Sequence, residues 1–296
     1  RHQDAVQPYA EALVIYRRLG EKRLQAHTLN AMGQVARALG EYEDALGLIR
    51  RSLMLDQQIN DRFRVGRKLC HLGMTYAEVG DVDRALTHLR QSAQANHQLG
   101  DRNGLEETLI GLAQVLLAAG AVKEAESTLL EAERMAAEGG SLFAKIRSAV
   151  TRADLAPELD ELQRALDATD EAIDLARDAA MPSGELQAQL RRSLVLLRQE
   201  STDDAREALD RADTLLSELS DVERAEYTHH LRADAYRRLG LSEKAEEALQ
   251  EGRKIIATRL GRMKSIELRK KYEALPHVAS LLENGKGSET SSDRLR

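Results

Sequence analysis

Tryptophan is absent from this 296-residue sequence, cysteine occurs once, and aromatic residues make up only 3% of the chain. A single cysteine, Cys70, excludes a disulfide framework and fits a reducing, cytoplasmic setting. The sequence has no run of about 18 apolar residues that would cross a membrane. Its first apolar stretch is amphipathic and follows polar residues, so we expect no signal peptide there. A net charge of −6 argues against a general nucleic-acid binder.

Motifs for catalysis are missing as well. The chain contains no phosphate-binding loop of the form G-x-x-x-x-G-K-[ST], no G-x-S-x-G and no H-E-x-x-H. His229 and His230 are adjacent, so on a helix they point in different directions and are poor joint metal ligands. Cys70 and His71 lack the activating neighbour and oxyanion site that a nucleophile needs. We therefore expect no catalytic residue, no metal site, no cofactor and no enzyme activity.

What the sequence does have is a 40-residue repeat built from good helix formers. Alanine recurs at Ala5, Ala45, Ala85, Ala125, Ala165, Ala205 and Ala245. Glycine recurs five residues before the alanine at Gly40, Gly80 and Gly120, and twelve residues before it at Gly33 and Gly73. Small residues at helical spacing let two backbones approach closely. Each unit is therefore predicted to be two antiparallel helices joined by a short turn.

The clearest unit predicts helices over residues 22–38 and 42–58. Gly40 is expected to cap the end of the first of these helices. In later units we expect Asp81 or Ser242 to cap the helix after the turn, and Pro157 to lie at a helix start.

The repeat also predicts how the chain is divided. A repeat array covers residues 1–260, with a partial unit at 1–20 and full units at 21–60, 61–100, 101–140, 141–182, 183–220 and 221–260. Residues 261–284 are expected to form C-terminal capping helices interrupted near Pro276, and residues 285–296 a disordered tail. The first unit holds only a second helix, and the sequence begins with arginine. We therefore expect the natural chain to continue upstream.

Two short motifs resemble a known repeat family. Residues 72–76, LGMTY, match the L-G-x2-Y motif of the tetratricopeptide repeat, and residues 85–89, ALTHL, match A-x3-F with leucine for phenylalanine. The period is longer than the usual 34 or so residues and the proline after the second helix is missing, so the helices should be about a turn longer. The resemblance implies an all-α, right-handed superhelical solenoid of antiparallel helix pairs. It has about six full units, a leading half-unit and a C-terminal capping helix.

The array resembles the tetratricopeptide regions of bacterial multidomain signalling regulators, namely signal-transduction ATPases, kinases and transcriptional activators. The resemblance rests on LGDRNGLEETL at residues 99–109 and on ELRKKYEALPHVASLLEN at residues 267–284. It implies a non-catalytic interaction or regulatory region, with any catalytic or DNA-binding domain outside these residues. The alternative is a free-standing scaffold or adaptor that binds a partner peptide, because the units also resemble those of animal polarity adaptors and kinesin light chains.

The resemblance also points to a binding surface, because in tetratricopeptide proteins the first helices line a concave face where ligands bind. The partner is expected to be a protein or peptide, or another domain of the same chain, with no role for nucleic acid or membrane. The first-helix positions that packing leaves available are His27, Asn30, Gln34, Arg37, Arg67, His71, Met74, Glu107, Gln114, Arg147, Asp154, Arg191, Arg198, Tyr227, His230, Asp234 and Arg237. Several are arginines, which grip carboxylates in bidentate fashion.

A basic segment near the C-terminus is a second candidate surface. Residues 253–271 contain eight lysines and arginines and one acid, Glu267. Such a segment is expected either to be a solvated helix face or to dock another acidic domain or a phosphate-bearing partner.

Overall fold

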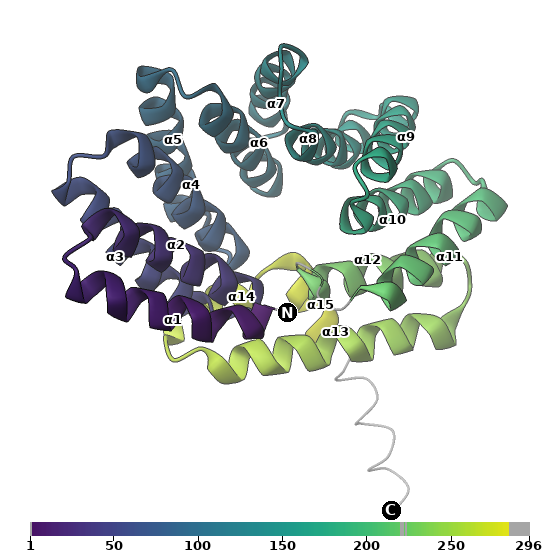
Figure 1. Cartoon of the computed structure of the whole chain (residues 1–296). Helices are drawn as coiled ribbons and strands as arrows, with labels where there is room; N and C mark the ends of the chain where they lie inside the picture. Colours follow the sequence, from purple (N-terminus) through teal and green to yellow (C-terminus); the bar gives the residue numbers. More distant parts are fainter. Residues whose placement is uncertain (1, 220–221, 223, 284–296) are drawn as a thin grey trace, which may run out of the picture.

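The computed structural model describes residues 2–219, 222 and 224–283, and the predicted tail at 285–296 lies outside these described residues (Figure 1). Within them the chain is all-α, as predicted, and forms a curved array of antiparallel helix pairs. The leading helix α1 spans His2–Arg18. The first helices of the six pairs are α2 (Lys22–Ala38), α4 (Arg62–Glu78), α6 (Arg102–Ala118), α8 (Leu142–Leu155), α10 (Pro182–Arg198) and α12 (Ala225–Arg238). Their partners are α3 (Tyr42–Gln58), α5 (Val82–Leu99), α7 (Val122–Ala137), α9 (Leu162–Asp178), α11 (Thr202–Glu218) and α13 (Ser242–Arg262).

The first helices lie on the inside of the arc and the second helices on the outside (Figure 1). Each first helix packs against its own partner and also against the first helix of the next unit, as α4 does against α6 and α10 against α12. The predicted helices over 22–38 and 42–58 are confirmed as α2 and α3. First helices therefore form the concave face, where the sequence placed the binding residues.

The repeated small residues hold the two helices of a unit together. Ala45, Ala85 and Ala125 are almost completely buried, and so are their equivalents in the later units. A Cβ on Gly33 would lie 2.6 Å from the Ile49 side chain, so the glycine lets α3 approach α2 closely. Gly40 has a φ angle of +73° just after α2, in agreement with its predicted capping role.

Helix starts are capped by short polar side chains in several units. Asp81 accepts a hydrogen bond from the backbone amide of Arg84, as predicted. The expectation for Ser242 was wrong, because this residue is the first of α13 and Leu241 holds the cap position. Pro157 lies in a short 3₁₀ turn, η1 (Ala156–Leu159), that links α8 to α9.

The C-terminal segment forms two short helices that break where the sequence predicted. α14 spans Ile266–Glu273 and α15 spans Pro276–Glu283. α15 packs against α12 and α13, which is the expected capping role. Leu281 lies against Gly252, where a Cβ would come within 3.1 Å of it.

The end of α13 and all of α14 also reach the first two units, which sequence reasoning did not predict. Arg259 donates a hydrogen bond to the Tyr42 hydroxyl at 2.8 Å, and the Tyr42 ring lies 5.9 Å from that of Tyr272. The backbone amides that follow α13, at Lys264 and Ser265, both donate to the Glu43 carboxylate, at 2.7 and 2.6 Å. Residues more than 200 positions apart are thus in direct contact, and the array closes on itself.

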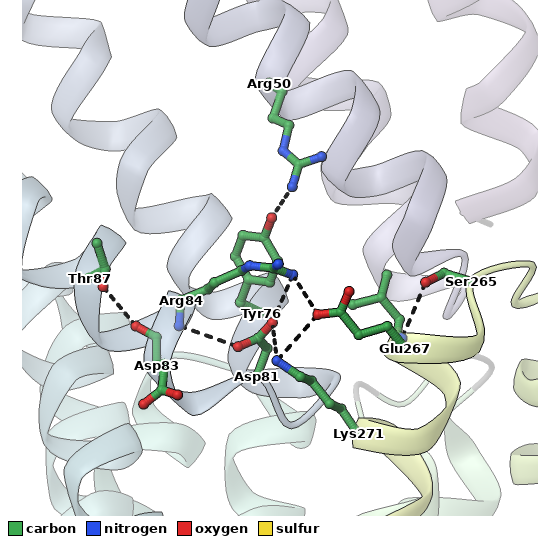
Figure 2. Close-up of polar contacts among 10 residues, drawn as sticks. Arg50, Tyr76, Asp81, Asp83, Arg84, Thr87, Ser265, Glu267 and Lys271 are labelled. Carbon is green, nitrogen blue, oxygen red and sulfur yellow. Dashed lines mark hydrogen bonds and ion pairs between the residues drawn. The ribbon is translucent and has the colours of Figure 1, made fainter.

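A second set of contacts joins α14 to the turn between α4 and α5. The Lys271 ammonium lies 2.8 Å from Asp81, and Arg84 lies 3.2 Å from Glu267, as Figure 2 shows. A Cβ on Gly80 would lie 2.6 Å from the backbone oxygen of Lys271, so α14 packs directly on this turn. Part of the basic segment at residues 253–271 is therefore used to neutralise acidic groups of the first units.

The closure is apolar as well as ionic. One hydrophobic cluster contains Leu46 and Ile49 of the first full unit, Ile256 of α13, and Tyr272 and Leu281 of the terminal helices. First and last units therefore share a core, and burial of this apolar surface stabilises the closed form.

Candidate functional site

The concave face carries the predicted binding residues, and many of them bond to one another across neighbouring helices. Asn30 on α2 lies 2.8 Å from Nδ1 of His71 on α4. Gln114 on α6 donates to the Thr151 hydroxyl on α8 at 2.9 Å and accepts from Arg147 at 3.4 Å. These residues therefore help to set the spacing of the first helices.

Arg37 and Glu78 continue this pattern at the end of α2 and α4, where they form an ion pair. Arg37 also donates to Gln34 at 3.2 Å within its own helix. The two charges offset each other, so this part of the concave face presents little net charge.

Arg191 is a structural residue rather than an exposed arginine. It is only 7% exposed, and its guanidinium forms two hydrogen bonds with Asp154 of the preceding unit, at 2.8 and 2.9 Å. It also lies 5.9 Å from the ring centre of Tyr227 on the next first helix. A buried, bidentate ion pair of this kind is strongly destabilised when one partner is removed. Arg191 and Asp154 therefore link three successive units.

Tyr227 and His230 are covered by the C-terminal helix α15. The His277 ring meets Tyr227 edge-on at 5.2 Å and lies 6.3 Å from His230. Nearby, Asp234 pairs with Arg238 at 2.9 Å, whereas Arg198 and Arg237 are exposed. At this end of the concave face, α15 therefore packs on residues that were predicted to bind a ligand.

A row of side chains within the first two turns of the early first helices stays accessible. We call it the first-turn row: His27, Arg67, Glu107 and Arg147, which occupy one repeat position in four successive units. His27 and Arg67 are exposed, and Glu107 and Arg147 are half-buried. Farther along α4, Met74 fills the space beside Gly111 of α6, where a Cβ would lie 2.6 Å from the sulfur.

Two phenylalanines extend this row, and sequence reasoning missed them. Phe63 and Phe143 are the only phenylalanines in the chain, lie 80 residues apart and are 51% and 50% exposed. Each precedes an arginine of the first-turn row by one helical turn, and the Arg147 guanidinium lies 5.7 Å from the ring centre of Phe143. Their spacing of two repeats was a signal in the sequence that could have identified them.

The chemistry of Cys70 and His71 is set by burial. Burial raises the pKa of the Cys70 thiol to about 12, and Glu107 adds to this effect. Burial lowers the pKa of His71 to about 3, helped by the positive charges of Arg37 and Lys68. A neutral thiol beside a neutral imidazole is a poor nucleophile and base pair.

Metal ligands and membrane spans were also sought within the described residues. No group of three or more histidine, cysteine, aspartate or glutamate side chains converges there as a metal site would require. In the same part of the chain, none of the helices combines the length and apolar character needed to span a bilayer.

Comparison with known families matches two tetratricopeptide-repeat models, over residues 28–62 and 64–138. Together with the helix-pair architecture, these matches support a tetratricopeptide-type repeat fold. No curated protein sequence matches the chain.

Solved structures give fold-level similarity over most of the chain. A Rap protein complexed with Competence and Sporulation Factor is 16% identical, with a TM-score of 0.67 over 87% of this chain and 72% of that one. The Rap conjugation gene regulator of plasmid pLS20, in complex with the Phr* peptide, is 15% identical, with a TM-score of 0.67 over 92% and 76%. Aspartyl phosphate phosphatase F from Bacillus subtilis is 16% identical, with a TM-score of 0.61 over 94% and 73%. At these identities the likeness establishes the fold alone.

Proposed function

We propose that this protein-interaction repeat chain binds an extended segment of a partner protein on its concave face, at the first-turn row. The observation that carries the proposal is the contrast along that face. Arg191 forms a buried ion pair and Tyr227 packs against His277 of α15, whereas Arg67 is exposed and the half-buried Arg147 makes only a long hydrogen bond, at 3.4 Å, to Gln114. Exposed phenylalanines beside both arginines add apolar contact area. Aromatic and arginine side chains are the types most enriched at binding hot spots.

The similar structures support a peptide as the ligand. Two of the Rap proteins named above are solved in complex with the Competence and Sporulation Factor and with the Phr* peptide. The same arrangement of helices therefore accommodates peptide ligands in other proteins. For this chain we propose a peptide with acidic side chains, because the first-turn row carries two arginines and one acid.

We further propose that the array is the non-catalytic interaction region of a larger signalling or transcriptional regulator, acting in the cytoplasm. A free-standing scaffold that binds a partner peptide is the alternative. One similar structure is named a phosphatase. The buried, neutral Cys70–His71 pair supports a non-catalytic role here, because it offers no activated nucleophile.

The experiment is selection of a random twelve-residue peptide library on the purified chain, followed by fluorescence-anisotropy titration of the selected peptides. Reversing charge in a double variant, Arg67→Glu with Arg147→Glu, should weaken binding at least tenfold. The peptides that no longer bind this variant should be mainly acidic. Arg51→Glu is the matched control, because Arg51 is exposed on the outer helix α3. Equal affinity for the wild-type chain and the double variant would exclude the first-turn row.

A further inference from the structure

The repeat position directly before that of the first-turn row faces the interior and carries a buried glutamate in two units. Glu106 on α6 and Glu226 on α12 lie three repeats apart and are 3% and 2% exposed. The other units place small or apolar residues here: Ala26, Gly66, Ile146 and Leu186. Burying a carboxylate is costly unless a cation or hydrogen-bond donors compensate it. Each buried glutamate therefore needs an explanation.

The carboxylate of Glu226 is compensated by a cation of the same chain, Arg259. The Arg259 guanidinium, itself 6% exposed, lies 2.5 Å from one carboxylate oxygen, and His277 lies 3.8 Å from the other. Burial alone would raise the pKa of Glu226. The nearby His277 ring and the charge of Arg259 outweigh burial and lower the pKa of Glu226 to about 2.

Glu106 lacks an equivalent partner among the described residues. Its buried Oε1 has no hydrogen-bond donor, and burial raises the pKa of the carboxyl even though Lys145 and Arg102 oppose the shift. Arg102 is one turn away but is held at the surface by Glu138, at 2.5 Å. The equivalent of the carboxylate that Arg259 pairs with in the sixth unit thus forms no ion pair in the third, although Arg102 and Lys145 lie near enough to lower its pKa.

A cavity of about 190 Å³ occupies the place of the missing cation. Its walls are formed by Arg102, Asn103, Glu106, Met135, Glu138, Gly139 and Gly140, and the Arg102 guanidinium in the wall is paired with Glu138. Gly139 lies three repeats before Arg259 and is its equivalent. α13 continues past this position to Arg262, whereas α7 ends at Ala137. A Cβ on Gly140 would lie 2.4 Å from the Glu106 Oε1, so a side chain there would displace the carboxylate.

We infer that the cavity between α6 and α7 receives the guanidinium of an arginine from a partner protein, with Glu106 as its acceptor. The internal template is the Arg259–Glu226 pair, in which the same repeat position binds a guanidinium. A planar guanidinium matches a carboxylate in bidentate fashion, and the C-terminal end of α7 also favours a positive group. Met135 offers an apolar wall for the methylene stem of the arginine. This site is independent of the proposed peptide site on the concave face.

The test uses three capped tripeptides as probes: acetyl-Gly-Arg-Gly-amide, its citrulline analogue and its lysine analogue. Backbone amide NMR signals of Gly139 and Gly140 report on the cavity walls. The arginine peptide should shift both signals in a saturable way, with a dissociation constant in the millimolar range expected of so small a ligand. The citrulline peptide should leave the signals unchanged. Equal affinity for the lysine peptide would overturn the guanidinium assignment.

Variants then test the acceptor. Glu106→Gln should weaken binding of the arginine peptide at least tenfold, and Glu106→Leu, which copies Leu186 of the fifth unit, should abolish it. Both remove an unpaired buried charge, so both should fold, which circular dichroism checks. Glu124→Gln, an exposed site on α7, is the matched control.

Unchanged binding by Glu106→Gln would contradict the proposal. The Arg67→Glu with Arg147→Glu variant should retain arginine-peptide binding, so failure of one site is distinguishable from failure of the other.

Discussion

At the residue scale, the turn between the two helices of a unit requires a positive φ angle. Gly40, Gly80 and Gly120 fill this position with φ angles of +73° to +77°. Asp160 and Glu200 occupy it in later units, with φ angles of 59° and 63°. A residue with a Cβ is strained in this region by about 1–2 kcal/mol. The units that lack this glycine have therefore kept the turn geometry at a cost in stability.

Replacing Glu200 with glycine should relieve that strain. Because glycine also gains freedom in the unfolded chain, we expect Glu200→Gly to raise the free energy of unfolding by only about 0.5–1 kcal/mol. Urea denaturation followed by circular dichroism measures this change. The control is Glu207→Gly, an exposed position inside α11, which should lower stability by about 1 kcal/mol. Destabilisation by both substitutions would show that the Glu200 side chain contributes more than its backbone costs.

His71 gives the protein a predictable response to acid. The pKa of His71 is about 3 in the folded state because of burial and of Arg37 and Lys68, and close to 6.5 when unfolded. Between these values the unfolded state binds more protons, so stability is lost as pH falls below about 6.5. The loss due to His71 should be about 1–2 kcal/mol between roughly pH 7 and pH 5.

Denaturant unfolding at both pH values compares the wild-type chain with His71→Gln, whose stability should depend less on pH. His97→Gln is the control, because His97 is exposed on α5. If His71→Gln keeps the full wild-type pH dependence, protonation of His71 does not limit stability in acid.

The binding residues show what sequence can and cannot predict at this scale. Period and helix direction correctly placed Arg67, Glu107 and Arg147 on first helices. They could not distinguish an arginine that is accessible to a ligand from one that is paired within the chain. Arg191 occupies a similar position on its first helix, but it forms an ion pair with Asp154 of the preceding unit. Ion pairing between units depends on where neighbouring side chains meet in space.

At the element scale, α2 and α3 were predicted to the residue because the spacing of small residues specifies where the helices meet. The break at Pro276 was predicted for an equally local reason, the missing amide of proline. The contact of α14 with the first units had no such signal. It joins segments with no shared period, and only the three-dimensional curvature of the array brings them together.

Tyr272 is the residue of α14 on which this contact most depends. It is completely buried, and its ring packs at a tilt of 47° against that of Tyr42 in the first full unit. If the array stays closed, Tyr272→Ala should lower the free energy of unfolding by about 3–5 kcal/mol. If it does not, the substitution should release α14 from the first units. Small-angle scattering should then show an increased radius of gyration, and hydrogen exchange should accelerate at the turn after α2. Ile266→Ala is the control on the same helix, since Ile266 is 72% exposed. Unchanged scattering with unchanged stability would mean that α14 does not hold the array closed.

At the scale of the whole molecule, closure changes how the concave face should be understood. An open solenoid would expose all of its first helices, whereas here α15 covers part of α12 and the last unit contacts the first (Figure 1). The available concave surface is therefore concentrated on α2 to α8. Closure also reduces how far units can move relative to one another, which preorganises that surface for a ligand.

The most direct measurement of the proposed function is cross-linking of a selected peptide that carries a photoreactive benzophenone group. After irradiation, mass spectrometry identifies the residues of the chain to which the peptide is joined. We predict cross-links within the first two turns of α4, α6 and α8, close to Arg67, Glu107 and Arg147, and their loss in the Arg67→Glu with Arg147→Glu variant. Cross-links confined to the outer helices α5 and α7, or unaffected by that variant, would contradict the account.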